Sequence, residues 1–309
     1  MSGNNRQAVV IGGGIMGGDI ATVFAAHGWT VHVMSPSQKT REALPARIAA
    51  GLAKLGAPAD YAASVHCHAE LKAIPWSGVD IVVEAATEDL PLKQKLFAEI
   101  EALARPDIPL ASNTSNFPIG EIAKGLKHPQ RVAGLHFFMP AHLVPLVEVV
   151  SSPLTDAAVA QSLLQLLKDL DKAPIWVRKD VPGFVGNRLQ HAMLREALYL
   201  IADGVTDAEG IDTAVRQGFG FRFIACGPMM QKEMSGWDTN YLVGEALYPH
   251  LHTEQVPPKF LKDMVAKGRT GMKAKAGMWD WDDEKMRKEK SRIEKALQAG
   301  FAVLRADGD

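Results

Sequence analysis

The chain is 309 residues long, more than one ordinary domain holds, so we expect two domains or one large α/β domain with an appendage. Its hydrophobic fraction of 47% and charged fraction of 22% are typical of a soluble globular protein. The net charge of -1 gives no electrostatic reason to expect nucleic acid or anionic lipid as a partner, so a small molecule is the expected ligand.

No segment reaches the roughly 18 uninterrupted apolar residues of a membrane span. The first residues lead into a predicted strand without a basic region and a cleavage site, which predicts a cytoplasmic protein. Cys67 and Cys226 are far apart in the sequence, so we expect no disulfide framework and predict that both are small core residues.

The first 180 residues alternate short β-branched runs with amphipathic helical patterns. This alternation predicts βαβ units, and therefore a Rossmann-type doubly wound parallel sheet in an NAD(P)-binding domain over residues 1–180. Strands are predicted at 7–12, 30–34, 79–85, 108–113, 131–137, 146–150 and 173–178. Helices are predicted near 15–27, 39–53, 89–104 and 155–170, the last with N-cap-like residues Thr155 and Asp156.

From about residue 181 the strand signal stops and an all-helical pattern continues, beginning with a long amphipathic segment over 182–204. We therefore predict an all-helical C-terminal domain over residues 181–309. The charged segment 282–297 alternates both signs, which is typical of a solvated helix face and not of a nucleic-acid-binding arm.

A glycine-rich loop follows the first predicted strand and opens the first helix. Gly12, Gly14 and Gly17 have the G-x-G-x-x-G spacing, with Ile15 and Met16 between them. In that context one glycine makes the turn, one lets the backbone approach a pyrophosphate and one allows close helix packing. The loop predicts a dinucleotide site whose phosphates meet the helix N-terminus, although a glycine-rich turn without a ligand has the same spacing.

The residues after the second strand bear on the choice of cofactor. An acidic residue about 20 positions after the glycines would bind the ribose 2′-hydroxyl of NAD, and none is present. Ser35, Ser37, Lys39 and Arg41 stand there, and hydroxyls with a guanidinium can bind a 2′-phosphate. We predict that NADPH is used at least as well as NADH; the alternative is a solvated loop and helix start.

Polar residues also follow the next two strands. Glu88 and Lys93 come after the strand at 79–85, and Asn113 to Ser115 end the strand at 108–113. Ligands bind at the carboxyl ends of the strands in an open α/β sheet, so we predict that Glu88, Lys93 and Asn113 contact the cofactor. Side chains such as those of Asn113 to Ser115 also cap helices, and that reading stays open.

Five motifs, "ASNTSN", "GLHFFMP", "PLVEVV", "DVPGFVGNRL" and "GIDTA", occur in the order and spacing of the 3-hydroxyacyl-CoA dehydrogenase family, which the chain resembles over nearly its whole length. The resemblance implies that His136 takes the proton of a secondary alcohol, that Glu148 orients His136, and that Ser115 and Asn187 contact the substrate hydroxyl. Histidine titrates near working pH, which suits a general base. Taken alone, a histidine in an apolar run is more often a core residue whose hydrogen bonds are satisfied.

Three departures from the acyl-CoA enzymes bear on the substrate. Met139 stands where the family has an asparagine, and only about 45 residues separate Ser35 from Val79, too few for the helical hairpin that helps to hold CoA. Arg222 resembles a basic residue of free hydroxy-acid dehydrogenases such as carnitine dehydrogenase and gulonate 3-dehydrogenase. An arginine can clamp a carboxylate, although a structural ion pair is the alternative. Trp237 could line the same pocket or lie in the core.

We therefore expect an NAD(P)-dependent dehydrogenase that oxidises the 3-hydroxyl of a free β-hydroxy acid. The alternatives are a 3-hydroxyacyl-CoA dehydrogenase and a non-catalytic dinucleotide-binding protein. No metal is expected, because alternation on a strand turns His66 and His68 to one face and Cys67 to the other. The family resemblance and the apolar helical faces imply a homodimer through the helical domain.

Overall fold

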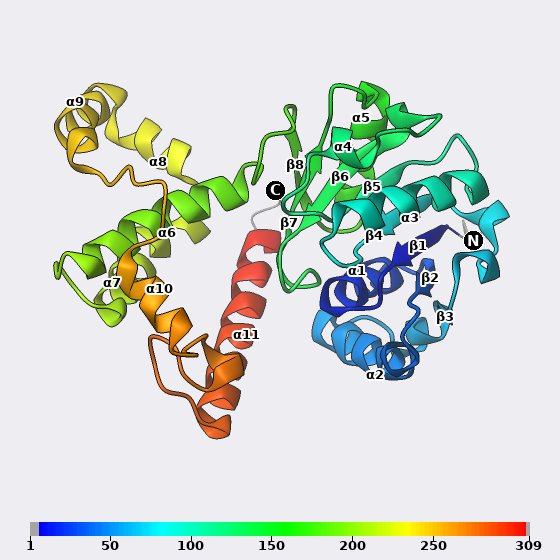
Figure 1. Cartoon of the computed structure of the whole chain (residues 1–309), viewed down its shortest axis with the longest axis horizontal. Coiled ribbons are helices and arrows are strands. Elements are labelled where there is room, and N and C mark those ends of the chain that lie inside the picture. The colour runs from blue at the N-terminus through cyan, green and yellow to red at the C-terminus, as the bar shows by residue number, and fades with distance from the viewer. Residues whose placement is uncertain (1–5, 307–309) are drawn as a thin grey trace. The chain divides into compact units, whose positions relative to one another are not determined.

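The computed structural model describes residues 6–306 and divides the chain into two compact units, Met1–Arg188 and Leu189–Asp309. The first unit holds the sheet, and the described part of the second is mainly helical, with two isolated β-bridges at Ala276 (Figure 1). The boundary near residue 180 and the assignment of separate tasks to the two domains stay predictions. No helix among residues 6–306 is both long enough and apolar enough to cross a membrane.

The described strands of the first unit form one sheet in the order β3-β2-β1-β4-β5-β6-β7-β8. All seven predicted strands are present, and β3 is an additional edge strand beside β2. The β-branched and aliphatic residues of β1, β2, β4 and β6 are almost wholly buried, as expected of strands covered on both faces. The strand bounds are β1 Gln7–Ile11, β2 Thr30–Met34, β3 Val65–His68, β4 Ile81–Glu84, β5 Leu110–Ser112, β6 Val132–Phe137, β7 Leu146–Val150 and β8 Ala173–Val177.

The predicted parallel, doubly wound sheet is confirmed except at one pair of strands, because β7 runs antiparallel to β6. Only residues 138–145 connect these strands, and a parallel crossover needs about a dozen residues or more. The antiparallel register pairs His136 with Glu148 directly across the two strands. The reversal therefore brings His136 and Glu148 together, two polar residues of a mostly apolar segment.

Helices cover both faces of the sheet, which makes it doubly wound. Apolar side chains of α1, α2 and α5 pack on one face, and those of α3 and α4 pack on the other. The predicted helices all form, with a short α4 in addition. Their bounds are α1 Ile15–Ala26, α2 Gln38–Leu55, α3 Leu90–Leu103, α4 Ile119–Ile122 and α5 Ala157–Asp169.

Of the two residues predicted to cap α5, only Asp156 does so. Its carboxylate accepts a hydrogen bond from the Ala158 backbone N–H at 2.9 Å. The Thr155 hydroxyl instead donates to the Val132 carbonyl at 2.7 Å. Thr155 therefore ties the loop before α5 to the start of β6, and the prediction that it caps the helix is wrong.

The second unit is helical, as predicted, but its helices bury almost nothing within the chain. Every buried hydrophobic side chain among the described residues lies at or before Phe184. Cys67 and Cys226 are unpaired and only half-buried, so the expectation that they are core residues is wrong. The helix bounds are α6 Gly186–Ala202, α7 Ala208–Thr213, α8 Pro228–Ser235, α9 Trp237–Leu247, α10 Lys259–Ala266 and α11 Asp283–Ala306.

Three histidines share one face at the sheet edge. His32 of β2 lies beside His66 and His68 of β3, with ring centroids 5.3 and 5.2 Å from its own. His32 Nδ1 is 3.1 Å from His68 Nε2, and Cys67 packs toward the opposite face. Among residues 6–306 no group of three or more His, Cys, Asp or Glu side chains is arranged to hold a metal ion.

This cluster predicts a loss of stability in acid. Burial, with the neighbouring His68 and His66, lowers the pKa of His32 from 6.5 to about 4. In the unfolded chain His32 binds a proton more readily than in the folded protein. The free energy of unfolding that depends on neutral His32 is therefore fully present above pH 6.5 and falls by about 3 kcal/mol as the pH is lowered to 4. Urea unfolding at several pH values should show this slope, and His32→Gln should flatten it while His191→Gln, at an exposed site, should not. An unchanged slope in His32→Gln would contradict the prediction.

Candidate active site

The glycine-rich loop turns where the sequence predicts, between β1 and α1. Gly12 has φ +105°, and a Cβ on Gly17 would lie 1.7 Å from the Gly12 carbonyl oxygen, so neither position admits a side chain. Gly14 is the N-cap residue of α1 and has open space where a Cβ would stand. No side chain caps this helix, so its first N–H groups are free to bind phosphate, and the loop fits a dinucleotide. Ile15 is exposed at the same helix start, while Met16 packs partly on the core.

Arg47 of α2 supports this loop and was not identified from the sequence. Its guanidinium donates to the carbonyls of Gly13 and Gly14 at 3.1 Å each and of Ile15 at 3.3 Å. Because these carbonyls accept hydrogen bonds from Arg47, they point toward α2, and the N–H groups of the loop remain available to bind an anion. The only sequence signal was that Arg47 is one of four cations on α2, the helix that packs against α1.

The residues proposed to read the adenosine ribose lie at the end of β2. Ser35 is buried, and Arg41 Nη1 donates to its carbonyl at 2.6 Å and to that of Pro36 at 2.9 Å. The Ser37 hydroxyl accepts a hydrogen bond from the Thr40 N–H and caps α2. Lys39 is exposed. Ser37 and Arg41 thus have structural partners, and no carboxylate stands among residues 35–41.

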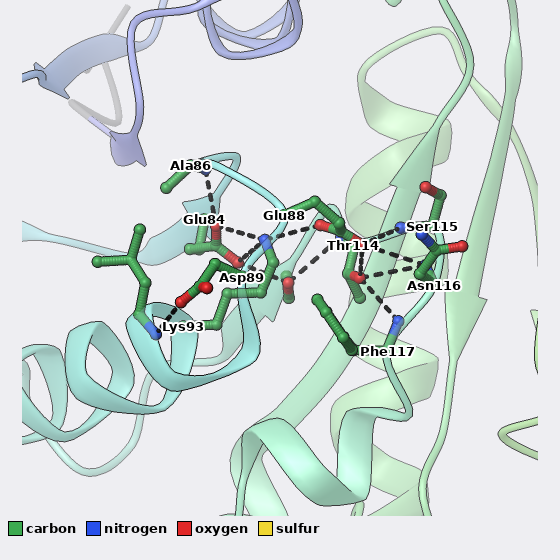
Figure 2. Close-up of polar contacts among 11 residues, drawn as sticks. Glu84, Ala86, Glu88, Asp89, Lys93, Thr114, Ser115, Asn116 and Phe117 are labelled. Carbon is green, nitrogen blue, oxygen red and sulfur yellow. Dashed lines mark hydrogen bonds and ion pairs between the residues drawn. The ribbon is translucent and has the colours of Figure 1, made fainter. Parts of the chain in front are cut away.

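A buried ion pair lies below the ends of β4 and β5. Figure 2 shows Lys93, 1% exposed, between two carboxylates: its ammonium is 2.8 and 3.0 Å from the oxygens of Glu84 and 3.2 Å from Glu88 Oε2. Glu84 also accepts hydrogen bonds from the Ser112 hydroxyl at 2.6 Å and the Ala86 N–H at 2.7 Å. Glu84 is therefore fully satisfied by protein groups, and Lys93 is directed inward toward them.

Glu88 connects this pair to the loop after β5. Its Oε1 accepts the hydroxyl of Thr114 and the N–H groups of Ser115 at 3.3 Å and Asn116 at 3.2 Å (Figure 2). Asn113 is also engaged with protein, since its Oδ1 accepts the Phe137 N–H at 2.9 Å. The Ser115 side chain itself stays half-buried at the sheet edge. The network sets the backbone from which the Ser115 hydroxyl projects.

His136 and Glu148 form a close pair in the interior. His136 Nδ1 is 2.6 Å from Glu148 Oε2, and the two residues are 5% and 0% exposed. Glu148 Oε1 accepts the N–H groups of Val185 at 2.9 Å and Gly186 at 2.8 Å. Burial alone would raise the pKa of Glu148, but the hydrogen bonds from His136, Gly186 and Val185 hold that pKa below its usual value. A carboxylate so held keeps Nδ1 protonated and leaves Nε2 as the basic atom.

Aromatic rings enclose the imidazole. The Phe138 and Phe184 ring centroids lie 4.7 and 5.5 Å from that of His136. Asn187 is half-buried in the first turn of α6, directly after the Gly186 N–H that Glu148 accepts. Met139, two residues beyond β6, is 64% exposed. The first unit thus combines an imidazole, a carboxylate bonded to it and an apolar enclosure that strengthens the hydrogen bond between them.

The two remaining predicted substrate contacts, Arg222 and Trp237, belong to the second unit. Arg222 is exposed in a short 3-10 helix, Gly220–Ile224, and has no carboxylate partner among the described residues. The structural ion pair offered as its alternative role is therefore not formed within the described chain. Trp237 opens α9 and is 49% exposed, so the alternative that it is a core residue is wrong.

Comparison with known proteins agrees with this geometry. Residues 7–181 match the model of the 3-hydroxyacyl-CoA dehydrogenase NAD-binding domain, and residues 183–281 match that of the family's C-terminal domain. The chain belongs to the 3-hydroxyacyl-CoA dehydrogenase family. It is a dehydrogenase with an NAD-binding domain, and it acts on a secondary CH–OH group.

Among its relatives is the 5-formyl-3-hydroxy-2-methylpyridine 4-carboxylate 5-dehydrogenase of Mesorhizobium japonicum, 32% identical over 72% of this chain and 70% of the relative. A crystal structure of an enzyme of that name, described as an NAD+-dependent dismutase, aligns with a TM-score of 0.90 at 28% identity, over 97% of this chain and 98% of the other. The (S)-3-hydroxybutyryl-CoA dehydrogenase of Ralstonia eutropha aligns with a TM-score of 0.72 at 29% identity, over 91% and 100%. The family thus includes relatives that act on free carboxylates and relatives that act on CoA esters.

Proposed function

We propose that this family member oxidises the 3-hydroxyl of a free hydroxy acid to the keto acid, with His136 as general base and Glu148 as its orienting partner. The observation that carries the proposal is the buried contact between His136 Nδ1 and Glu148 Oε2 at 2.6 Å. A dehydrogenase needs a base at the alcohol oxygen, and this pair presents one imidazole nitrogen in a fixed tautomer.

In the proposed mechanism the alcohol donates a hydrogen bond to His136 Nε2, which takes its proton during oxidation. Glu148 stabilises the imidazolium that forms and is itself kept ionised by the Val185 and Gly186 N–H groups. The bound nicotinamide supplies the hydride acceptor. Ser115 and Asn187 orient the substrate oxygen, and Phe138 and Phe184 limit the access of water.

Three features favour a free acid over a CoA ester. The thioether of Met139 cannot donate the hydrogen bond of the amide it replaces. Between β2 and β3 the chain forms one helix, α2, and a short 3-10 turn at Ala59–Ser64, without a helical hairpin that could hold CoA. The relative that aligns at a TM-score of 0.90 carries a carboxylate in its substrate's name. A 3-hydroxyacyl-CoA substrate is the alternative.

Arg222 is the proposed carboxylate clamp, and its substitution tests the substrate class. Since a bidentate, charge-assisted pair contributes about 1.5–3 kcal/mol, Arg222→Ala should raise the KM for the acid by about tenfold or more. Hydroxy acids, aldehyde-bearing carboxylates and their CoA esters would be compared by absorbance of the reduced cofactor. Arg216→Ala, at another exposed arginine of the same segment, is the control. An unchanged KM for every acid would refute the clamp, and turnover of CoA esters alone would refute the free-acid proposal.

We also propose that NADP serves as cofactor at least as well as NAD, because residues 35–41 contain no carboxylate that would repel a 2′-phosphate. The expected ratio of kcat/KM for NADP over NAD is one or greater. Ser35→Asp should lower this ratio by about tenfold or more, since it adds a charge that repels phosphate and binds the ribose hydroxyls. A wild-type preference for NAD of about tenfold would overturn the proposal.

The second unit supports a homodimer as the working form. Large apolar side chains on α8, on α9 and on the 3-10 turn Tyr248–His250 remain exposed and line one groove, among them Met229, Trp237, Tyr241 and Tyr248. Exposed apolar surface of this extent is typical of a protein interface. Light scattering should give twice the mass of the chain, and a monomer at micromolar concentration would contradict the proposal.

A further inference from the structure

One short turn connects the two catalytic strands, and its position sets part of the proposed site. Residues 138–145, here called the dyad turn, run from the end of β6, which bears His136, to the start of β7, which bears Glu148. The Phe138 ring of this turn lies 4.7 Å from the His136 ring, and Met139 is exposed beside it. A displacement of the dyad turn would therefore move the wall against which the imidazole packs.

Two charged side chains from other elements hold the dyad turn. Asp19 of the cofactor helix α1 accepts the Ala141 N–H through Oδ2 at 3.2 Å. Lys172, just before β8, donates to the carbonyls of Ala141 at 2.6 Å and Val144 at 3.1 Å. Burial lowers the pKa of Lys172 to about 8, while Asp171 and Asp19 act in the opposite direction. Neither Asp19 nor Lys172 was identified from the sequence.

His142 at the centre of the dyad turn is unusual in being buried without a hydrogen bond. Its side chain is 9% exposed, and neither ring nitrogen has a hydrogen-bond partner within the described residues. Nδ1 lies 3.4 Å from Asp19 Oδ1, an ion-pair separation without hydrogen-bond geometry. An unsatisfied buried polar group costs about 1–3 kcal/mol, so an apolar side chain here would be more stable. Groups that lower stability in this way are concentrated at functional sites.

We propose that His142, held against Asp19, is a positioning residue that couples the cofactor helix α1 to the dyad turn and thereby aligns the His136 site with the bound dinucleotide. The inference rests on the proposed role of His136. Asp19 accepts the Ala141 N–H with one carboxylate oxygen and lies beside the His142 ring with the other. One carboxylate on α1, the helix proposed to bind the pyrophosphate, therefore contacts the turn that packs against His136. A misplacement of the reacting groups by about 1 Å can cost 10²-fold in rate.

The test separates positioning from stability by replacing His142 with an apolar residue. His142→Leu should leave the unfolding midpoint unchanged or raised, because it removes the unsatisfied ring nitrogens. It should lower kcat by about ten- to a hundredfold and change the dinucleotide Kd by no more than about twofold. Asp19→Asn, which keeps an oxygen for the Ala141 N–H but removes the charge, should also lower kcat. His142→Gln, which keeps a polar group beside Asp19, should restore most of the rate. His27→Gln is the control, since His27 ends the same helix and pairs with Asp171 at 3.5 Å.

Amide hydrogen exchange of residues 138–145, measured without substrate, gives a readout that does not depend on turnover. It should be faster in both Asp19→Asn and His142→Leu than in the wild type and in His27→Gln. Wild-type exchange in both variants, wild-type kcat in His142→Leu, or a loss of rate that merely follows a loss of folded protein would overturn the inference. The absence of wild-type turnover with any hydroxy acid or CoA ester would instead count against the proposed function.

Discussion

Replacing His136 by asparagine is expected to lower kcat by about 10²-fold or more, because it removes the proposed base. Asparagine can still donate to Glu148, so the interior contact and the fold should persist. The dinucleotide Kd should not change, since the phosphate loop lies on other strands and helices. Stopped-flow measurement of cofactor reduction, together with a fluorescence titration of the reduced dinucleotide, would show both results.

The control for this experiment is His128→Asn, at a half-buried histidine that precedes the same strand. It should retain the wild-type kcat. A kcat near the wild-type value in His136→Asn would rule out the proposed base and would leave His136 as an internal histidine satisfied by Glu148. A parallel loss of dinucleotide affinity would show instead that the substitution had disturbed the first unit as a whole.

Replacing Lys93 by methionine is expected to reduce the free energy of unfolding by about 3–5 kcal/mol, because Glu84 would be left as a buried charge without its cation. Glu84 is 0% exposed, and Lys93 is its only cationic partner among the described residues. Urea unfolding at neutral pH measures the loss. Lys95→Met is the matched control: Lys95 is 74% exposed, pairs within residues 6–306 only with Glu99, and should change stability by no more than about 0.5 kcal/mol.

A second substitution distinguishes the buried charge from lost packing. Adding Glu84→Gln to Lys93→Met removes the unpaired charge and should restore part of the stability. A loss below about 1 kcal/mol in Lys93→Met would contradict the prediction. A titration with the dinucleotide would also test whether Lys93 contacts the cofactor, as the sequence predicts, or affects it only through Glu88 and the Ser115 backbone.

The elements of the first unit follow from local patterns, and the sequence was therefore informative about them. Buried strands of β-branched residues and helices with caps such as Asp156 depend on neighbours a few residues away. Errors occurred where distant parts of the chain decide the outcome. The predicted capping role of Thr155 is wrong because its hydroxyl bonds to the Val132 carbonyl, which belongs to a strand 23 residues earlier in the chain.

The candidate site shows the same division. His136, Glu148, Ser115 and Asn187 were recognised because ordered motifs carry a family's chemistry at fixed spacings. Arg47, Asp19 and Lys172 were missed because each bonds to backbone groups far away in the chain. Nothing in the sequence around these three residues distinguishes them from other charged residues. Trp237 had two alternative positions in the sequence analysis, the pocket and the core, and its 49% exposure excludes only the core.

By itself, the sequence determined the family, the fold class, the phosphate loop and the pair of residues proposed for proton transfer. The hydrophobic period, the glycine spacing and the order of the motifs are local properties of the amino-acid sequence, so they could be recognised without the structure. Only the tertiary structure decided that β7 turns back on β6, which places Glu148 opposite His136 and buries both. It also decided that Glu88, Lys93 and Asp19 reach across neighbouring loops, because such contacts depend on how separate segments pack.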